Sequence, residues 1–147
     1  MHNLEKAKKL LAECGYTCVL CSHSDTRTSH LRGVAPLLGW LDEGKPLDQY
    51  SAADKVVGKG AAYLYILLKI KELYADVISV PAYNTLKQYG IPVTFQTMTQ
   101  AIKNRDRTGF CPIETAVMDI DNPHTALTAI RRKLEEMKNA GDKNEKS

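Results

Sequence analysis

Long apolar runs are missing from this sequence of 147 residues. No stretch approaches the roughly 20 consecutive apolar residues that a membrane-spanning helix needs. The amino-terminal residues also have no apolar core of the kind that a secretory signal peptide carries. We therefore expect a protein without a membrane span and with a cytoplasmic location, in which the four cysteines are mostly reduced.

Charge of one sign is also scarce. The 20 Lys and Arg residues are nearly balanced by 17 Asp and Glu residues, giving a net charge of +3. Much of the positive charge lies in mixed runs with acids, which is typical of solvated helix faces. Because the chain has neither a one-signed basic face nor an aromatic platform for stacking bases, we do not expect a nucleic-acid partner.

Metal-ligand spacings are absent as well. Cys18 and Cys21 form a Cys-x-x-Cys pair, but this pair lies in a strand-like segment, where residues three apart point to opposite faces. We expect both thiols to be structural. The four histidines are scattered, so surface or structural roles are expected for them: His2, His23, His30 and His124. We expect no metal and no cofactor.

Hydrophobic periodicity predicts an α/β protein with one domain, residues 1–140, and a disordered polar tail at 141–147. We expect a three-layer α/β/α arrangement around a mixed sheet of about four to five strands. The strand, helix and strand that follow residue 72 are expected to form a parallel unit. The predicted order is a helix from residue 3, a hairpin over 16–33, helices over 34–44 and 51–70, a strand over 73–79, a helix over 81–90, a strand over 92–97, and helices from 111 and 122.

The predicted helix over 51–70 is the element around which the rest is organised. Ser51 followed by Asp54 has the spacing of a capping box at a helix start. Residues 61–68 carry no charge, so the helix should be covered on several sides. Gly58 and Gly60 cost roughly 1 kcal/mol each inside a helix. A close approach of the backbone to a sheet or a ligand would compensate for this cost.

Two lysines lie near the predicted start of this helix. Lys55 and Lys59 are four residues apart on one helix face, near the positive end of the helix dipole, where an anion is favoured. The alternative is that both are ordinary solvated lysines. We expect Lys59 to point into a crevice, because it stands between two glycines and directly before the apolar run.

A second polar group follows the last predicted strand. The segment 98–110 is either a mobile loop or a loop that faces a ligand. Its candidate ligand-binding residues are Arg105, Asp106 and Thr108. In open α/β sheets, strand ends and helix starts collect around one crevice, so this group and the lysines could meet there.

Cys111 opens the next predicted helix and is the candidate nucleophile. The helix dipole and nearby arginines favour its thiolate, while nearby acids oppose it. We expect Cys111 to be the most reactive of the four thiols, although inert packing is the alternative. Glu114 is placed either to transfer protons or to cap this helix.

Four segments carry a resemblance to a known family: DKVVGKGAA at 54–62, YADVIS at 74–79, YGIPV at 89–93 and NRDRTGFCPIETAV at 104–117. Together they resemble an uncharacterised bacterial family, the domain-of-unknown-function family numbered 1893, over residues 16–134. The resemblance implies the fold of the cytidine deaminase-like superfamily. It implies no activity, because one fold hosts many functions.

The same resemblance bears on zinc. Zinc deaminases open the long helix with a His or Cys and a Glu, and the next helix with Pro-Cys-x-x-Cys. This chain has no His or Glu over 45–70, and after Pro81 it has Ala82 and Thr85 at the cysteine positions. Cys111 comes too late to replace either one. Zinc-dependent base deamination is therefore not expected.

Two functions remain open. The first is a non-catalytic, perhaps regulatory module that binds a small anionic or nucleotide-like ligand in a deaminase-like crevice. The second is a metal-independent enzyme in which Cys111 is the nucleophile, Lys59 holds an anion, and Asp54 or Glu114 handles protons.

Overall fold

The computed structural model describes residues 3–31, 33–102 and 111–146, with side chains described through residue 139. Over these residues, a five-stranded sheet has the strand order β2-β1-β3-β4-β5. No described helix is both long and apolar enough to cross a membrane. The elements are α1 (Asn3–Cys14), β1 (Cys18–Cys21), β2 (Thr26–Ser29), α2 (Ala35–Glu43), β3 (Ser51–Val57), α3 (Lys59–Leu68), β4 (Glu72–Ser79), α4 (Val80–Gln88), β5 (Val93–Thr99), α5 (Pro112–Val117) and α6 (Pro123–Lys146).

The sheet is mixed, as predicted. β1 pairs antiparallel with β2, which confirms the hairpin, and it also pairs antiparallel with β3. β3, β4 and β5 are parallel, so the unit of β4, α4 and β5 has the predicted strand direction. Pro81 lies in the first turn of α4, where its missing amide hydrogen costs no hydrogen bond.

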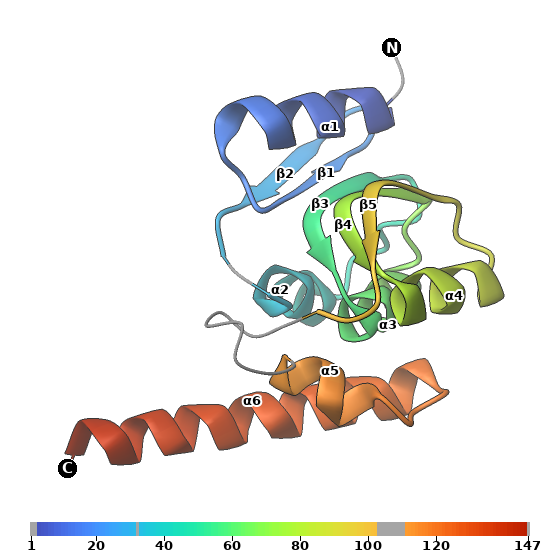
Figure 1. The fold of residues 1–147 in the computed structure, drawn as a ribbon. Helices are drawn as coiled ribbons and strands as arrows, with labels where there is room; N and C mark the ends of the chain where they lie inside the picture. Colours follow the sequence, from blue (N-terminus) through green and yellow to red (C-terminus); the bar gives the residue numbers. More distant parts are fainter. Residues whose placement is uncertain (1–2, 32, 103–110, 147) are drawn as a thin grey trace.

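Helices cover both faces of the sheet (Figure 1). α1 packs on one face, over β1 and β3, while α2, α3 and α4 lie on the other face. α5 and α6 form an outer layer that contacts α3 (Figure 1). The predicted covering of the apolar helix is confirmed, because α3 is buried over Gly60–Tyr65 and packs against four other helices.

Side chains in the sheet divide between two apolar clusters. Cys18 and Leu20 belong to the main core on the α3 side, whereas Val19 and Cys21 belong to a smaller cluster with α1. The two cysteines of the Cys-x-x-Cys pair therefore point to opposite faces, as the strand period requires. Both are buried free thiols, so the predicted structural assignment fits their positions.

The predicted helix start at Ser51 is wrong. Residues Ser51–Val57 form β3, which is hydrogen-bonded between β1 and β4, and the helix begins only at Lys59. The Ser51 hydroxyl caps no helix, and it donates a hydrogen bond to Glu72 Oε2 at 2.6 Å. Pairing on both sides overrides the weak strand propensity of this small, polar segment.

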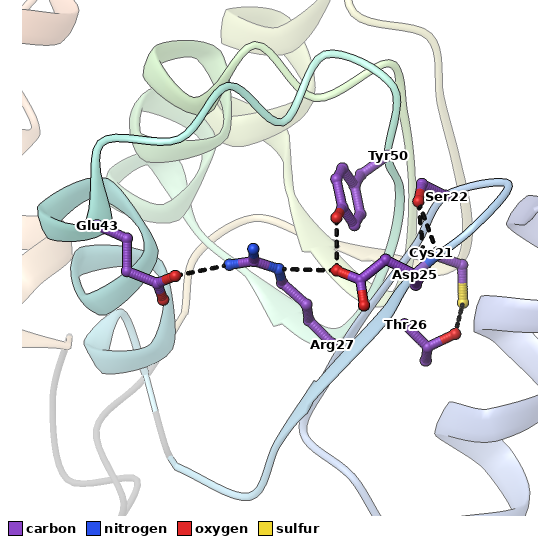
Figure 2. Close-up of polar contacts among 7 residues, drawn as sticks. All are labelled: Cys21, Ser22, Asp25, Thr26, Arg27, Glu43 and Tyr50. Carbon is purple, nitrogen blue, oxygen red and sulfur yellow. Dashed lines mark hydrogen bonds and ion pairs between the residues drawn. The ribbon is translucent and has the colours of Figure 1, made fainter.

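The hairpin is tied to the rest of the fold by an ionic network (Figure 2). Arg27 on β2 donates to Asp25 Oδ2 at 3.3 Å and to Glu43 Oε1 at 3.0 Å, and Tyr50 donates to the same Asp25 oxygen at 2.6 Å. The bonds from Tyr50 and Arg27 hold the Asp25 pKa below its usual value, chiefly through the Tyr50 hydroxyl. The network connects the hairpin to α2 and to the residue that leads into β3.

The carboxyl-terminal helix is longer than its apolar stripe suggests. α6 runs to Lys146, through most of the segment for which the composition predicts a disordered tail. The domain limits at 140 and 141 stay predictions.

Candidate functional site

The amino terminus of α3 binds a carboxylate that comes from another helix. Glu114, in the first turn of α5, accepts a hydrogen bond from the Lys59 amide at 2.7 Å on Oε1 and from the Gly60 amide at 2.9 Å on Oε2. Gly58, the N-cap residue, has no side chain to cap the helix. Glu114 therefore satisfies two of the amides that a helix start leaves without partners, and its charge complements the helix dipole.

The two glycines make room for this contact. A Cβ atom on Gly58 would overlap the Glu114 carboxyl group, and one on Gly60 would lie 2.8 Å from Ile113 Cγ2. The predicted compensation by close approach is thus found, although the approaching group is the α5 helix and not a sheet or a ligand. The Gly-Lys-Gly sequence is explained by the packing of α5 on α3.

Lys59 completes a reciprocal arrangement between the two helices. Its ammonium group donates to the carbonyl oxygen of Met118, the C-cap of α5, at 2.9 Å, and lies 5.7 Å from the centre of the Tyr63 ring. Glu114 thus caps the start of α3 while Lys59 caps the end of α5. Each charge lies at the helix end that favours it. Lys59 is half-buried, and this carbonyl takes up one of its three donors.

Cys111 occupies the predicted place at the start of α5. It is the N-cap residue, it is half-buried, and it packs against the main core. Its amide donates to the carbonyl of Ile102 at 3.0 Å, and its carbonyl accepts from the Thr115 amide at 3.0 Å. The backbone of Cys111 is therefore fixed by hydrogen bonds on both sides.

Asp54 lies in a separate site beneath α3. It is only 8% exposed on β3, and its carboxylate accepts from the Tyr65 hydroxyl at 2.6 Å and from the Val56 amide at 3.3 Å. The same hydroxyl lies 3.1 Å from Cys18 Sγ. A thiol, a phenol and a carboxylate are thereby joined in a buried chain between β1, α3 and β3.

Burial is the main cause of the pKa shifts of these three hydrogen-bonded groups. It raises the Asp54 pKa to about 7, although hydrogen bonds from Tyr65 and from the backbone oppose the shift. Burial also raises the pKa values of Tyr65 and Cys18. A carboxyl group that titrates near neutral pH is suited to proton transfer or pH sensing. The raised pKa of Cys18 keeps that thiol protonated and unreactive.

The predicted site residues therefore fall into separate places. Glu114 and Lys59 meet at the start of α3, with Cys111 three residues before Glu114. Asp54 is buried mid-strand, and Lys55 is an exposed strand residue, so the predicted helix face shared with Lys59 is wrong. Three predicted ligand-binding residues lie outside the described part of the chain: Arg105, Asp106 and Thr108.

Sequence reasoning missed two members of the buried chain, Tyr65 and Cys18. A signal existed for Tyr65, because a tyrosine inside an uncharged run needs a partner for its hydroxyl when it is buried. Asp54, eleven residues earlier in the sequence, is the carboxylate that accepts this hydrogen bond. The helix assignment of 51–57 hid the pairing, because it placed Asp54 in the first turn of a helix as part of a capping box.

Comparisons with known proteins identify relatives of this chain. The family described as "Domain of unknown function (DUF1893)", TM1506, matches residues 6–134. The crystal structure of a DUF1893 family protein, TM1506 from Thermotoga maritima, is similar with a TM-score of 0.81 and 26% sequence identity, covering 92% of this chain and 91% of that chain. No curated protein matches the chain at a significant level. On the extent of the family match, this chain belongs to the DUF1893 family.

Proposed function

We propose that this protein is a non-catalytic ligand-binding module that takes a small anionic or nucleotide-like ligand at the start of α3. The observation that carries the proposal is the carboxylate of Glu114, held by the Lys59 and Gly60 amides at 2.7 and 2.9 Å. Two amides at a helix start that hold one anionic group can hold another, such as a phosphate or carboxylate. The ligand would replace Glu114 and release α5 from α3.

The proposal includes a deaminase-like fold that is used without zinc. The residues at the start of α4 do not fit a zinc ion, because Ala82 has no donor atom and Thr85, also buried, offers only a hydroxyl. The start of α3 contributes backbone amides and one lysine. These groups suit an anion better than a cation.

The alternative is a metal-independent enzyme with Cys111 as the nucleophile. Its supporting groups are engaged elsewhere: the Lys59 ammonium group with the Met118 carbonyl, and the Asp54 carboxylate with Tyr65. We therefore expect Cys111→Ser to leave phosphate binding unchanged. Alkylation and peptide mapping provide the second readout. Labelling of the half-buried Cys111 faster than of the exposed Cys14, together with a turnover that Cys111→Ser abolishes while binding stays intact, would favour the enzyme.

Competition by Glu114 gives the main test. Isothermal titration with inorganic phosphate and with a nucleoside monophosphate should show weak binding to the wild type and tighter binding to Glu114→Gln. The expected gain is roughly tenfold or more, because a hydrogen bond to a charged group contributes about 1.5–3 kcal/mol. Glu135→Gln, which removes an exposed acid on α6, is the matched control and should bind like the wild type. Equal affinities for all three proteins would contradict the proposal.

A further inference from the structure

β5 leaves one edge of the sheet open. It is the last strand in the order β2-β1-β3-β4-β5, and no strand in the described part of the chain pairs with its outer side (Figure 1). Its seven residues extend over roughly 23 Å at about 3.3 Å per residue. The outer edge therefore presents a row of backbone donors and acceptors that another strand can pair with.

The faces of β5 are also unusually exposed for a parallel strand. Parallel strands are normally covered on both faces, yet each residue from Thr94 to Met98 is exposed. Phe95 is 38% exposed even though its ring packs edge-on against Tyr83 of α4, and Met98 is 37% exposed. A neighbouring strand with its side chains would cover both apolar groups.

In its own sequence, β5 lacks the residues by which proteins protect an open strand edge. Its sequence, VTFQTMT, contains no charged residue, proline or glycine. The opposite edge differs, because β2 is only four residues long and carries Arg27, which is paired with Asp25 and Glu43. The β2 edge is therefore protected against pairing with another strand, and the β5 edge is not.

We propose that β5 is the interface of a homodimer, in which β5 of a second copy pairs antiparallel with it across a two-fold axis near Gln96. Gln96 is the middle residue of β5, so an axis there lets all seven residues pair. β5 is a strip without charged side chains (the neutral strip) in a protein in which 25% of the residues are charged. It therefore has no side chain that could form an ion pair with a charged partner. A second copy presents the same neutral strip, so no like charges meet.

The test is the mass in solution by size-exclusion chromatography with light scattering, from about 10 to 500 μM. The wild type should approach twice the chain mass of 16.4 kDa as the concentration rises. Gln96→Lys should remain at the monomer mass, because it places two lysines at the axis. Thr28→Lys changes an exposed position on the opposite edge strand, β2. It is the matched control and should dimerise normally. A monomeric wild type at 500 μM, or a dimer that persists in Gln96→Lys, would overturn the proposal.

A cross-linking variant tests the geometry without weakening the interface. In a Cys14→Ser background, oxidised Gln96→Cys should form a disulfide-linked dimer, because residues at a two-fold axis of antiparallel strands lie within disulfide reach. Thr28→Cys in the same background should not. Equal cross-linking of the two variants would count against an axis near Gln96.

Discussion

Asp54 is a buried acid whose carboxylate accepts hydrogen bonds from the Tyr65 hydroxyl and the Val56 amide. Its pKa is raised by burial from 3.8 to about 7. The native protein therefore retains a proton that the unfolded chain releases above about pH 4. Asp54 contributes its full stability below pH 3.8, and that contribution is lost as the pH rises to about 7 and slightly beyond.

Asp54→Asn tests this loss of stability with rising pH. Between pH 5 and pH 8, ionisation of Asp54 should cost the wild type about 2–3 kcal/mol of unfolding free energy. Asparagine keeps an acceptor for the Tyr65 hydroxyl but cannot ionise, so the variant should lack this loss. Urea unfolding at the two pH values measures the difference. If the two proteins respond to pH in parallel, the Asp54 pKa is not raised.

At the scale of elements, α3 and α5 are joined by groups at their ends. The carboxylate of Glu114 and the ammonium of Lys59 each cap the other helix, and Gly58 is the residue that permits the approach. No local pattern predicts this contact, because Lys59 and Glu114 are 55 residues apart in the chain. The sequence predicted that a close backbone approach compensates for Gly58 and Gly60, but it did not identify α5 as the approaching element.

A double-mutant cycle tests the steric part of this contact. Gly58→Ala should destabilise the wild type by about 1–3 kcal/mol, the usual cost of overpacking, because the added methyl group overlaps Glu114. In a Glu114→Ala background the same change should cost almost nothing, since the extended backbone at Gly58 suits alanine. Urea unfolding gives all four free energies.

The control for this cycle is Gly39→Ala in α2. A Cβ atom there would meet nothing within 4 Å, so the variant should be neutral or slightly more stable. A Gly58→Ala penalty of the same size in both backgrounds would show that Glu114 is not the group that requires glycine.

β3 shows where element prediction failed. Its first residues, Ser51–Ala53, carry no β-branched side chain, and the spacing of Ser51 and Asp54 suggested a capping box at a helix start. The segment is a strand because hydrogen bonds from β1 and β4 enclose it on both sides. The hairpin, α2, α4 and the parallel β4–β5 pair were predicted correctly, since their hydrophobic period and their glycine and proline boundaries are local signals.

At the scale of the whole molecule, α5 and α6 form an outer layer on α3 (Figure 1). This layer covers the helix start to which our proposal assigns the ligand. The fold class could be predicted because it depends on the alternation of helices and strands. The site could be predicted only in part, because its two halves lie on segments that the fold, and not the sequence order, brings together.

The backbone amides of Lys59 and Gly60 report most directly on the central claim. In 15N-resolved spectra of Glu114→Ala, both amide resonances should move on addition of inorganic phosphate and saturate together with the binding curve. In the wild type they should move only at higher phosphate concentration, because Glu114 competes for the same donors. Phosphate shifts confined to other residues, or none at these two amides in either protein, would contradict an anion site at the start of α3.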